Sequence, residues 1–153
     1  MANTYTQIHI HIVFAVKGKT NRIPPENTDR VSKYITGIVQ EKGQKMIVIK
    51  CMHDHLHLLI GQRPNIALSD LVRDIKSCSS AFIKREHLAS QSFSWQEGFG
   101  AFSYAKSDIP VVARYIENQE EHHKRRSFRE EYLNILRKFE IDYDPQYVFE
   151  WYD

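Results

Sequence analysis

Residues 51–61 read CMHDHLHLLIG and carry a clear β-strand signal with three histidines. Its polar and apolar side chains alternate, which is typical of a β-strand. Because alternate side chains of a strand share one face, His53, His55 and His57 lie on one side and Leu56 points to the other. A break at His53 and the next residue allows a hairpin with the apolar run before it. The stretch therefore predicts a sheet with a histidine-bearing face and a buried face.

Strand and helix signals on both sides of this stretch complete an α+β pattern. Alternation predicts strands, and apolar residues spaced three and four apart predict helices. The predicted elements are a strand at 5–16, a helix from about 27 to 43, strands at 46–51 and 53–60, a helix at 67–86, a strand in the second half of 89–107, and helices at 109–124 and 128–139. The first six elements match the split βαβ pattern. We therefore expect a ferredoxin/RRM-like antiparallel sheet with helices on one face, plus C-terminal helices.

The composition is that of one ordinary globular domain. The chain has 153 residues, 42% hydrophobic and 26% charged, which excludes a collagen, a disordered chain and a disulfide scaffold. The formal net charge of +2 hides an uneven distribution, because residues 1–63 carry +5 and residues 109–153 carry −3. The small total therefore does not argue against DNA binding. We expect one domain over 1–153, with a C-terminal helix and an acidic, aromatic tail from about 127 to 153.

Targeting and redox signals are weak. Cys51 and Cys78 form no CxxC pair, so neither a disulfide framework nor a cysteine zinc site is predicted. The first 16 residues are polar and alternating, unlike a signal peptide, and no apolar run approaches the roughly 20 residues of a membrane span. We expect a cytoplasmic protein that does not interact with a membrane.

The alternating histidines indicate a metal site. Two imidazoles on one strand face can converge on one ion, while the residue between them packs into the core. The simpler interpretation is a row of solvent-exposed imidazoles. The presence of His53 beside His55 and His57 leaves open which pair would bind the ion.

The helix predicted at 109–124 carries complementary groups. Tyr115, Gln119 and His122 are spaced four and three residues apart, so they share a helix face. Gln119 could complete a His-His-Gln site whose three neutral ligands leave the full 2+ charge on the ion, and such an ion polarises a phosphoryl oxygen. A tyrosine beside it can act as a covalent nucleophile. Taken alone, Tyr115 would be a half-buried aromatic and Gln119 a solvated helix residue.

These two motifs together resemble a known family. The strand text HLH is similar to the HUH motif (His, bulky hydrophobic residue, His), and RYIENQ is similar to the Tyr-x-x-x-Gln helix of the small single-tyrosine HUH transposases. That family comprises the TnpA-like enzymes of small insertion sequences and their REP-associated relatives. The resemblance covers roughly residues 5–125 and includes the first strand with its basic turn.

The resemblance implies specific roles. It makes Tyr115 the nucleophile, makes His55, His57 and Gln119 the metal ligands, and reduces His53 to a flanking residue. It implies Mg²⁺ or Mn²⁺, although imidazole ligands by themselves also suit Zn²⁺, Ni²⁺ or Cu²⁺. It further implies a homodimer that acts on single-stranded DNA with hairpins. Attack on the scissile phosphate would leave a 5′-phosphotyrosine and a free 3′-OH, so that the strand can be rejoined.

Basic side chains are the expected DNA contacts, because single-stranded DNA needs cations along its backbone. The candidates follow the first strand, lie on the second long helix, or form the run after the tyrosine helix: Lys17, Lys19, Arg22, Arg73, Lys76, Lys124, Arg125 and Arg126. The alternative is a solvated charged surface. An acidic tail near the groove would repel DNA, and its aromatic residues could instead pack a dimer.

Two other functions remain open at this point. A catalytically silent module of the same fold would bind hairpin DNA or RNA in a salt-dependent manner without cleaving it. A histidine-rich metal hydrolase would cleave without a tyrosine adduct. The sequence argues against the hydrolase, because Asp54 is the one carboxylate expected near the histidines and we expect it to point to the opposite face.

Overall fold

The computed structural model describes residues 3–152, which contain a four-stranded antiparallel sheet with strand order β2-β3-β1-β4. Its strands are β1 (His9–Ala15), β2 (Lys45–Cys51), β3 (His55–Gly61) and β4 (Gly100–Tyr104). All three strand pairs are antiparallel, and β2 and β3 form the expected hairpin. This confirms the predicted α+β fold, although β1 begins later than the alternation from residue 5 suggested.

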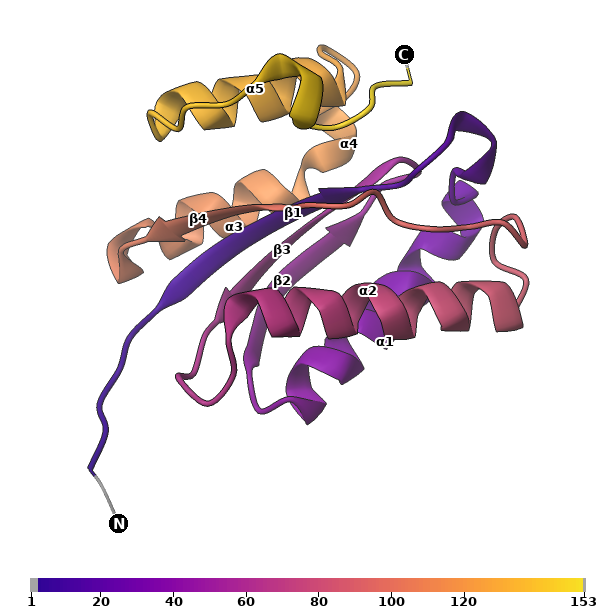
Figure 1. Cartoon of the computed structure of the whole chain (residues 1–153). Helices are drawn as coiled ribbons and strands as arrows, with labels where there is room; N and C mark the ends of the chain where they lie inside the picture. Colours follow the sequence, from indigo (N-terminus) through magenta and orange to yellow (C-terminus); the bar gives the residue numbers. More distant parts are fainter. Residues whose placement is uncertain (1–2, 153) are drawn as a thin grey trace.

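Helices cover both faces of the sheet (Figure 1). The first pair, α1 (Thr28–Glu41) and α2 (Leu68–Arg85), lies on one face. The C-terminal helices α3 (Ile109–Glu117), α4 (Gln119–His122) and α5 (Phe128–Lys138) lie on the other. Within residues 3–152, no helix is both long enough and apolar enough to cross a bilayer.

The two faces explain the burial pattern of the central strands. Ile12 and Phe14 of β1 and Leu58 of β3 point toward α1 and α2 and are fully buried in the main core. Val13 and Ala15 point to the opposite face and are equally buried, because α5 packs over them. The histidine side of β1 and β3 is therefore an interior between the sheet and the C-terminal helices.

The helix expected at 109–124 is broken in two. The N–H of Asn118 still donates to the carbonyl of Arg114, but the residue leaves helical geometry at φ −94° and ψ 24°, and α4 starts at Gln119. Asparagine competes with helix geometry through its own side-chain and backbone hydrogen bonds, so it is a natural break point. The break allows the Gln119 side chain to be fully buried against the sheet.

The C-terminal tail packs on its own chain. Phe149 is buried against Phe128 and Tyr132 of α5, and Trp151 packs beside them. Phe139 contacts aromatic residues of β4. These contacts hold α5 against the sheet, so these aromatic side chains are used within one chain.

Candidate active site and metal centre

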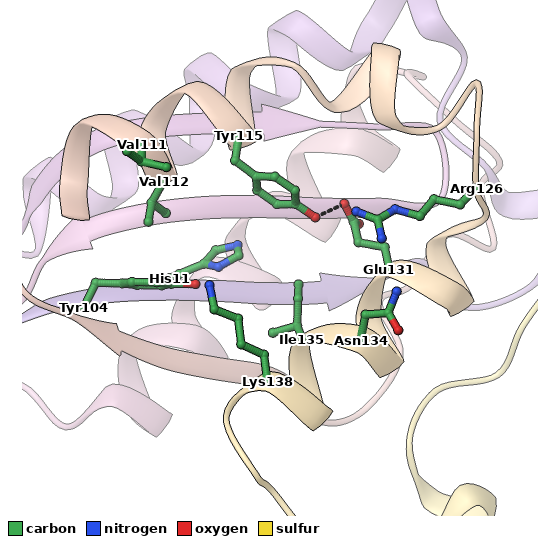
Figure 2. Close-up of a pocket in the computed structure, with 10 residues that line it drawn as sticks. All are labelled: His11, Tyr104, Val111, Val112, Tyr115, Arg126, Glu131, Asn134, Ile135 and Lys138. Atoms are coloured by element: carbon green, nitrogen blue, oxygen red, sulfur yellow. Dashed lines mark hydrogen bonds between the residues drawn. The ribbon is translucent and has the colours of Figure 1, made fainter.

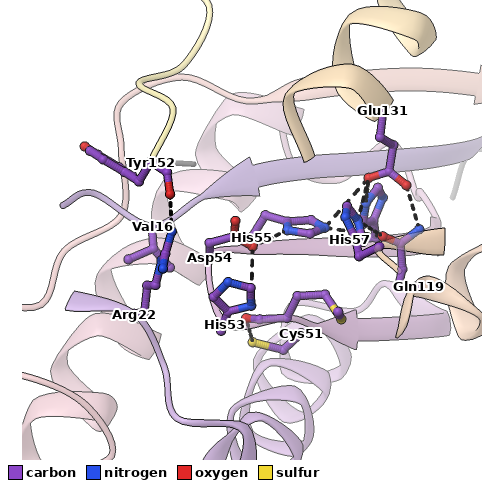
Figure 3. Close-up of polar contacts among 12 residues, drawn as sticks. Val16, Arg22, Cys51, His53, Asp54, His55, His57, Gln119, Glu131 and Tyr152 are labelled. Carbon is purple, nitrogen blue, oxygen red and sulfur yellow. Dashed lines mark hydrogen bonds and ion pairs between the residues drawn. The ribbon is translucent and has the colours of Figure 1, made fainter. Parts of the chain in front are cut away.

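His55 and His57 point from β3 into the space under the C-terminal helices (Figure 3). His57 pairs in register with Val13 of β1, and the two imidazole rings lie 5.1 Å apart between centroids. Both side chains are at most 1% exposed. The strand spacing therefore places the two rings on one face, as expected, and their burial excludes the interpretation as a row of surface imidazoles.

A carboxylate from α5 lies between these rings. Oε1 of Glu131 is 3.0 Å from Nε2 of His57 and 3.7 Å from Nε2 of His55. It also lies 3.2 Å from Nε2 of His123. Burial by itself would raise the pKa of Glu131, but the hydrogen bonds from His123 and His57 outweigh it and hold this pKa well below its usual range. Glu131 is thus a buried carboxylate at the centre of an imidazole cluster.

Gln119 and Tyr115 meet at the same carboxylate. The amide nitrogen of Gln119 donates to Oε2 of Glu131 at 3.0 Å, and the Tyr115 hydroxyl donates to the same oxygen. The Gln119 amide oxygen lies 3.3 Å from Nε2 of His55. Burial, together with the neighbouring Glu131, raises the pKa of the Tyr115 phenol. The four residues singled out in the sequence therefore lie in one cluster, with Glu131 joining them.

The outer ring nitrogen of each histidine has its own partner. Nδ1 of His55 lies 2.7 Å from Oδ1 of Asp54, and Nδ1 of His57 lies 2.8 Å from Nε2 of His11. Such partners orient an imidazole and leave its other nitrogen free for a metal. Burial would raise the pKa of Asp54, but the hydrogen bond with His55 and the nearby imidazole charges lower it to about 2. The expectation that Asp54 points away from the histidines is wrong, because the turn before β3 directs it at His55.

The side chains at the centre fit a divalent cation. His55, His57 and Glu131 are buried, and each offers a ligand atom within 4.8 Å of the others. Two imidazoles and a carboxylate are a common donor set for divalent metals. Glu131 was not predicted as a ligand from the sequence, which indicated three neutral ligands. Its position on the apolar stripe of α5, three residues after Phe128 and four before Ile135, could have indicated that Glu131 is buried, but not which residues it contacts.

The basic side chains expected to contact DNA divide into two groups. Four have protein partners: Arg22 donates to the carbonyl of Tyr152, Arg73 pairs with Asp70, Lys124 pairs with Glu121, and Lys76 donates to the carbonyls of Gln96 and Gly98. Burial lowers the pKa of Lys76 to about 8. These four are held in structural contacts.

The second group of basic candidates consists of Lys17, Lys19, Arg125 and Arg126. Lys17, Lys19 and Arg125 are exposed and form no ion pair within the described part of the chain. Arg126 lines a cavity together with Tyr115 and Glu131 (Figure 2). It is the basic candidate that lies beside the tyrosine.

Comparisons with known proteins identify the family of this chain. The sequence profile described as "Transposase IS200 like" matches residues 4–119. The ISDra2 transposase TnpA of Deinococcus radiodurans is 24% identical over 118 residues, which cover 74% of this chain and 84% of that protein.

Two solved structures share the fold. A crystal structure from D. radiodurans R1, of a protein described as a transposase, superposes with a TM-score of 0.57 at 21% identity and covers 78% of this chain and 95% of that one. A REP-associated tyrosine transposase bound to a REP hairpin superposes with a TM-score of 0.58 at 12% identity, covering 80% of this chain and 73% of that one. The matched profile ends at Gln119, so α5 and Glu131 lie beyond it.

Proposed function

The chain belongs to the IS200-like transposase family, and from this premise we propose that it cuts and rejoins single-stranded DNA through a covalent bond between Tyr115 and a 5′ phosphate. The observation that carries the proposal is the cluster in which the Tyr115 hydroxyl, the two strand histidines and Gln119 meet under the C-terminal helices. A phenol near a metal-binding donor set is suited to phosphoryl transfer. We take residues 1–153 as one domain that performs this reaction.

The proposed reaction conserves the phosphodiester bond energy. The Tyr115 oxygen attacks the scissile phosphorus, the bond from phosphorus to the 3′ oxygen breaks, and the 3′ oxygen leaves with a proton as a free hydroxyl. The Tyr115 hydroxyl donates a hydrogen bond to Oε2 of Glu131, which orients the phenol; its proton is released as the oxygen attacks, and the leaving 3′ oxygen takes up one proton. The resulting phosphotyrosine can be attacked by another 3′ hydroxyl, which rejoins a strand and restores the phenol.

A divalent cation would be held by His55, His57, Gln119 and Glu131. When bound, it supplies the positive charge that polarises a phosphoryl oxygen. We propose Mg²⁺ or Mn²⁺, because the oxygens of Glu131 and Gln119 make the donor set more favourable to these metals than two imidazoles alone. Asp54 and His11 contact the Nδ1 atoms of His55 and His57 and so orient the two imidazole rings.

We propose single-stranded DNA with hairpins as the substrate. Support comes from the structural neighbour that is bound to a REP hairpin, and from exposed cations such as Lys17, Lys19 and Arg125. A homodimer remains a proposal from the resemblance, and sedimentation equilibrium tests it. Within one chain, the Tyr115 hydroxyl already reaches the histidine cluster.

The proposed function is tested by covalent capture. We expect a labelled single-stranded hairpin oligonucleotide, incubated with the protein and Mn²⁺ or Mg²⁺, to give an adduct that survives denaturing electrophoresis. The adduct disappears with a chelator and in Tyr115→Phe. Tyr147→Phe is the matched control, because this tyrosine is 82% exposed and outside the cluster. An adduct that persists in Tyr115→Phe refutes the nucleophile assignment.

The same experiment separates the two rival functions. A silent binding module would retain salt-dependent binding of the oligonucleotide and form no adduct in the unmodified protein. A metal hydrolase would release cleaved DNA without an adduct, retain that activity in Tyr115→Phe and lose it in His57→Ala.

A further inference from the structure

Tyr115 is the most accessible side chain of the cluster that it forms with the two strand histidines, Gln119 and Glu131. The other four side chains are at most 1% exposed, whereas Tyr115 is half-buried. Tyr115 lines a cavity of about 270 Å³ between the sheet and the C-terminal helices (Figure 2). A phosphodiester can therefore reach the phenol through this cavity, while protein covers the imidazole side of the cluster.

Two basic side chains line the same cavity. Arg126 extends into it from the loop between α4 and α5, and Lys138 extends into it from the last turn of α5 (Figure 2). Nζ of Lys138 lies 5.7 Å from the centre of the Tyr104 ring, which forms part of the wall. Within residues 3–152, neither basic side chain forms an ion pair, because the carboxylate of Glu131 is bonded to imidazoles. The cavity therefore presents two positive charges beside the phenol.

The rest of the lining restricts the chemistry of an occupant. Oδ1 of Asn134 accepts from Arg137 at 2.9 Å, which leaves the NH₂ group of Asn134 as a further donor. Val112 and Ile135 supply apolar walls. The volume is at or just below the low end of typical small-molecule sites, about 300–1,000 Å³, so the cavity suits one phosphate with its sugar rather than a length of strand. The occupant should thus be anionic, rich in acceptor oxygens and partly apolar.

We propose that this cavity holds the scissile phosphate, and that Arg126 and Lys138 bind its non-bridging oxygens. The inference rests on the proposed function, because it takes Tyr115 as the nucleophile. The planar guanidinium of an arginine can hold two phosphate oxygens at once, whereas a lysine ammonium acts as a point charge.

Arg126 is then a catalytic residue. As the Tyr115 oxygen bonds to phosphorus and the bond to the 3′ oxygen breaks, negative charge on the non-bridging oxygens increases. A fixed guanidinium therefore binds the transition state more tightly than the bound substrate. Arg126 and Lys138 neutralise charge in this step and exchange neither a proton nor an electron.

The phosphate site can be tested without DNA or metal. Thermal unfolding is measured in a chelator with inorganic phosphate, and with chloride at the same ionic strength. We expect a rise in Tm of about 3–6 °C when phosphate is at about ten times its Kd. Arg126→Gln and Lys138→Met should lose most of this rise. Arg129→Gln is the matched control and should retain it, because Arg129 is exposed in the first turn of α5 and is absent from the lining of the cavity among the described residues.

The catalytic role is tested by the rate of adduct formation at saturating hairpin oligonucleotide with Mn²⁺. Arg126→Gln should lower this rate about 100-fold or more. Arg126→Lys should lower it less, because it keeps the charge and loses the planar fork. Millimolar guanidinium chloride, far below denaturing concentrations, should restore part of the rate in Arg126→Ala and none in Tyr115→Phe. Arg129→Gln should form the adduct at the unmodified rate.

The outcomes separate this proposal from the proposed function. The same response to phosphate in the unmodified protein, Arg126→Gln and Lys138→Met would overturn the phosphate site. An unchanged rate in Arg126→Gln, or a lowered rate that neither Arg126→Lys nor guanidinium improves, would overturn the catalytic role. A phosphate response that depends on Arg126, without any adduct in the unmodified protein, would keep the site and refute the proposed function. An adduct without such a response would do the reverse.

Discussion

Replacing Glu131 by Gln should separate metal binding from folding. The substitution preserves shape, and its amide oxygen can still accept from Tyr115 and Gln119. Its NH₂ group can donate to Nε2 of His57 and His123, because a neutral imidazole can present a lone pair there. We therefore expect the free energy of unfolding in a chelator to change by about 1 kcal/mol or less.

The effect on the metal should be much larger. If the carboxylate is a ligand, its loss should weaken metal affinity by about 100-fold, the upper end of the roughly 10–100-fold range seen for residues that support metal ligands. At a free metal concentration of about 100 times Kd, the ion stabilises the unmodified protein by about 2.7 kcal/mol, and the variant by about 0.4 kcal/mol. For a domain of this size, the metal-induced rise in Tm should fall from roughly 5–11 °C to about 1–2 °C.

Thermal unfolding with Mn²⁺ and with chelator measures both quantities, and isothermal titration gives Kd directly. Glu130→Gln is the matched control, because Glu130 occupies the same turn of α5 and is exposed. An unchanged metal-induced rise in Tm for Glu131→Gln would show that the carboxylate is not a ligand. A large loss of stability of Glu131→Gln in chelator would show that the hydrogen bonds to residue 131 depend on its negative charge.

A change of pH and three substitutions probe the site and its supports. Burial lowers the pKa of His11, and the pKa of Asp54 is lowered to about 2, so the unfolded chain binds more protons than the folded chain below neutral pH. The free energy of unfolding in urea should therefore fall from pH 7.5 to pH 4. Asp54→Asn should remove about 0.3 kcal/mol of this loss between pH 5 and pH 4, and about 2 kcal/mol if unfolding is followed down to pH 2. Gly100→Ala places a methyl group 2.9 Å from a ring carbon of Tyr132, which should displace α5 and cost about 1–3 kcal/mol, with weaker metal binding. Leu58→Ala should cost about 2–5 kcal/mol through a core cavity and leave metal affinity per folded molecule unchanged.

Each of these expectations has its own contradicting result. A pH profile that is flat between pH 7.5 and pH 4 would contradict the shifts at His11 and Asp54. Gly37→Ala is the control for Gly100→Ala, because a methyl group at Gly37 meets nothing within 4 Å. Equal changes in the free energy of unfolding for Gly100→Ala and Gly37→Ala would show that α5 is not in tight contact with β4 at Gly100. A loss of metal affinity in Leu58→Ala beyond the unfolded fraction would show that the core and the site are coupled.

The sequence by itself determined the sheet and its histidine pair. Alternation is a local property, because successive side chains of a strand point to opposite faces whatever surrounds them. Residues 53–60 therefore predicted a strand whose imidazoles share a face, and the order of the neighbouring elements predicted the antiparallel sheet. The spacing of Tyr115 and Gln119 was also readable, since it needs only a helical turn.

The tertiary structure decided how the site is closed. Asn118 breaks the predicted helix, and Gln119 enters the interior because of that break. Glu131 contacts His57 across 74 positions of the chain, and no local periodicity encodes such a contact. Only the packing of α5 over the histidine face brings them together. The alternation of a strand depends only on residues that are neighbours in the sequence. The position of a buried carboxylate between two imidazoles depends instead on how a helix distant in the sequence packs against the sheet.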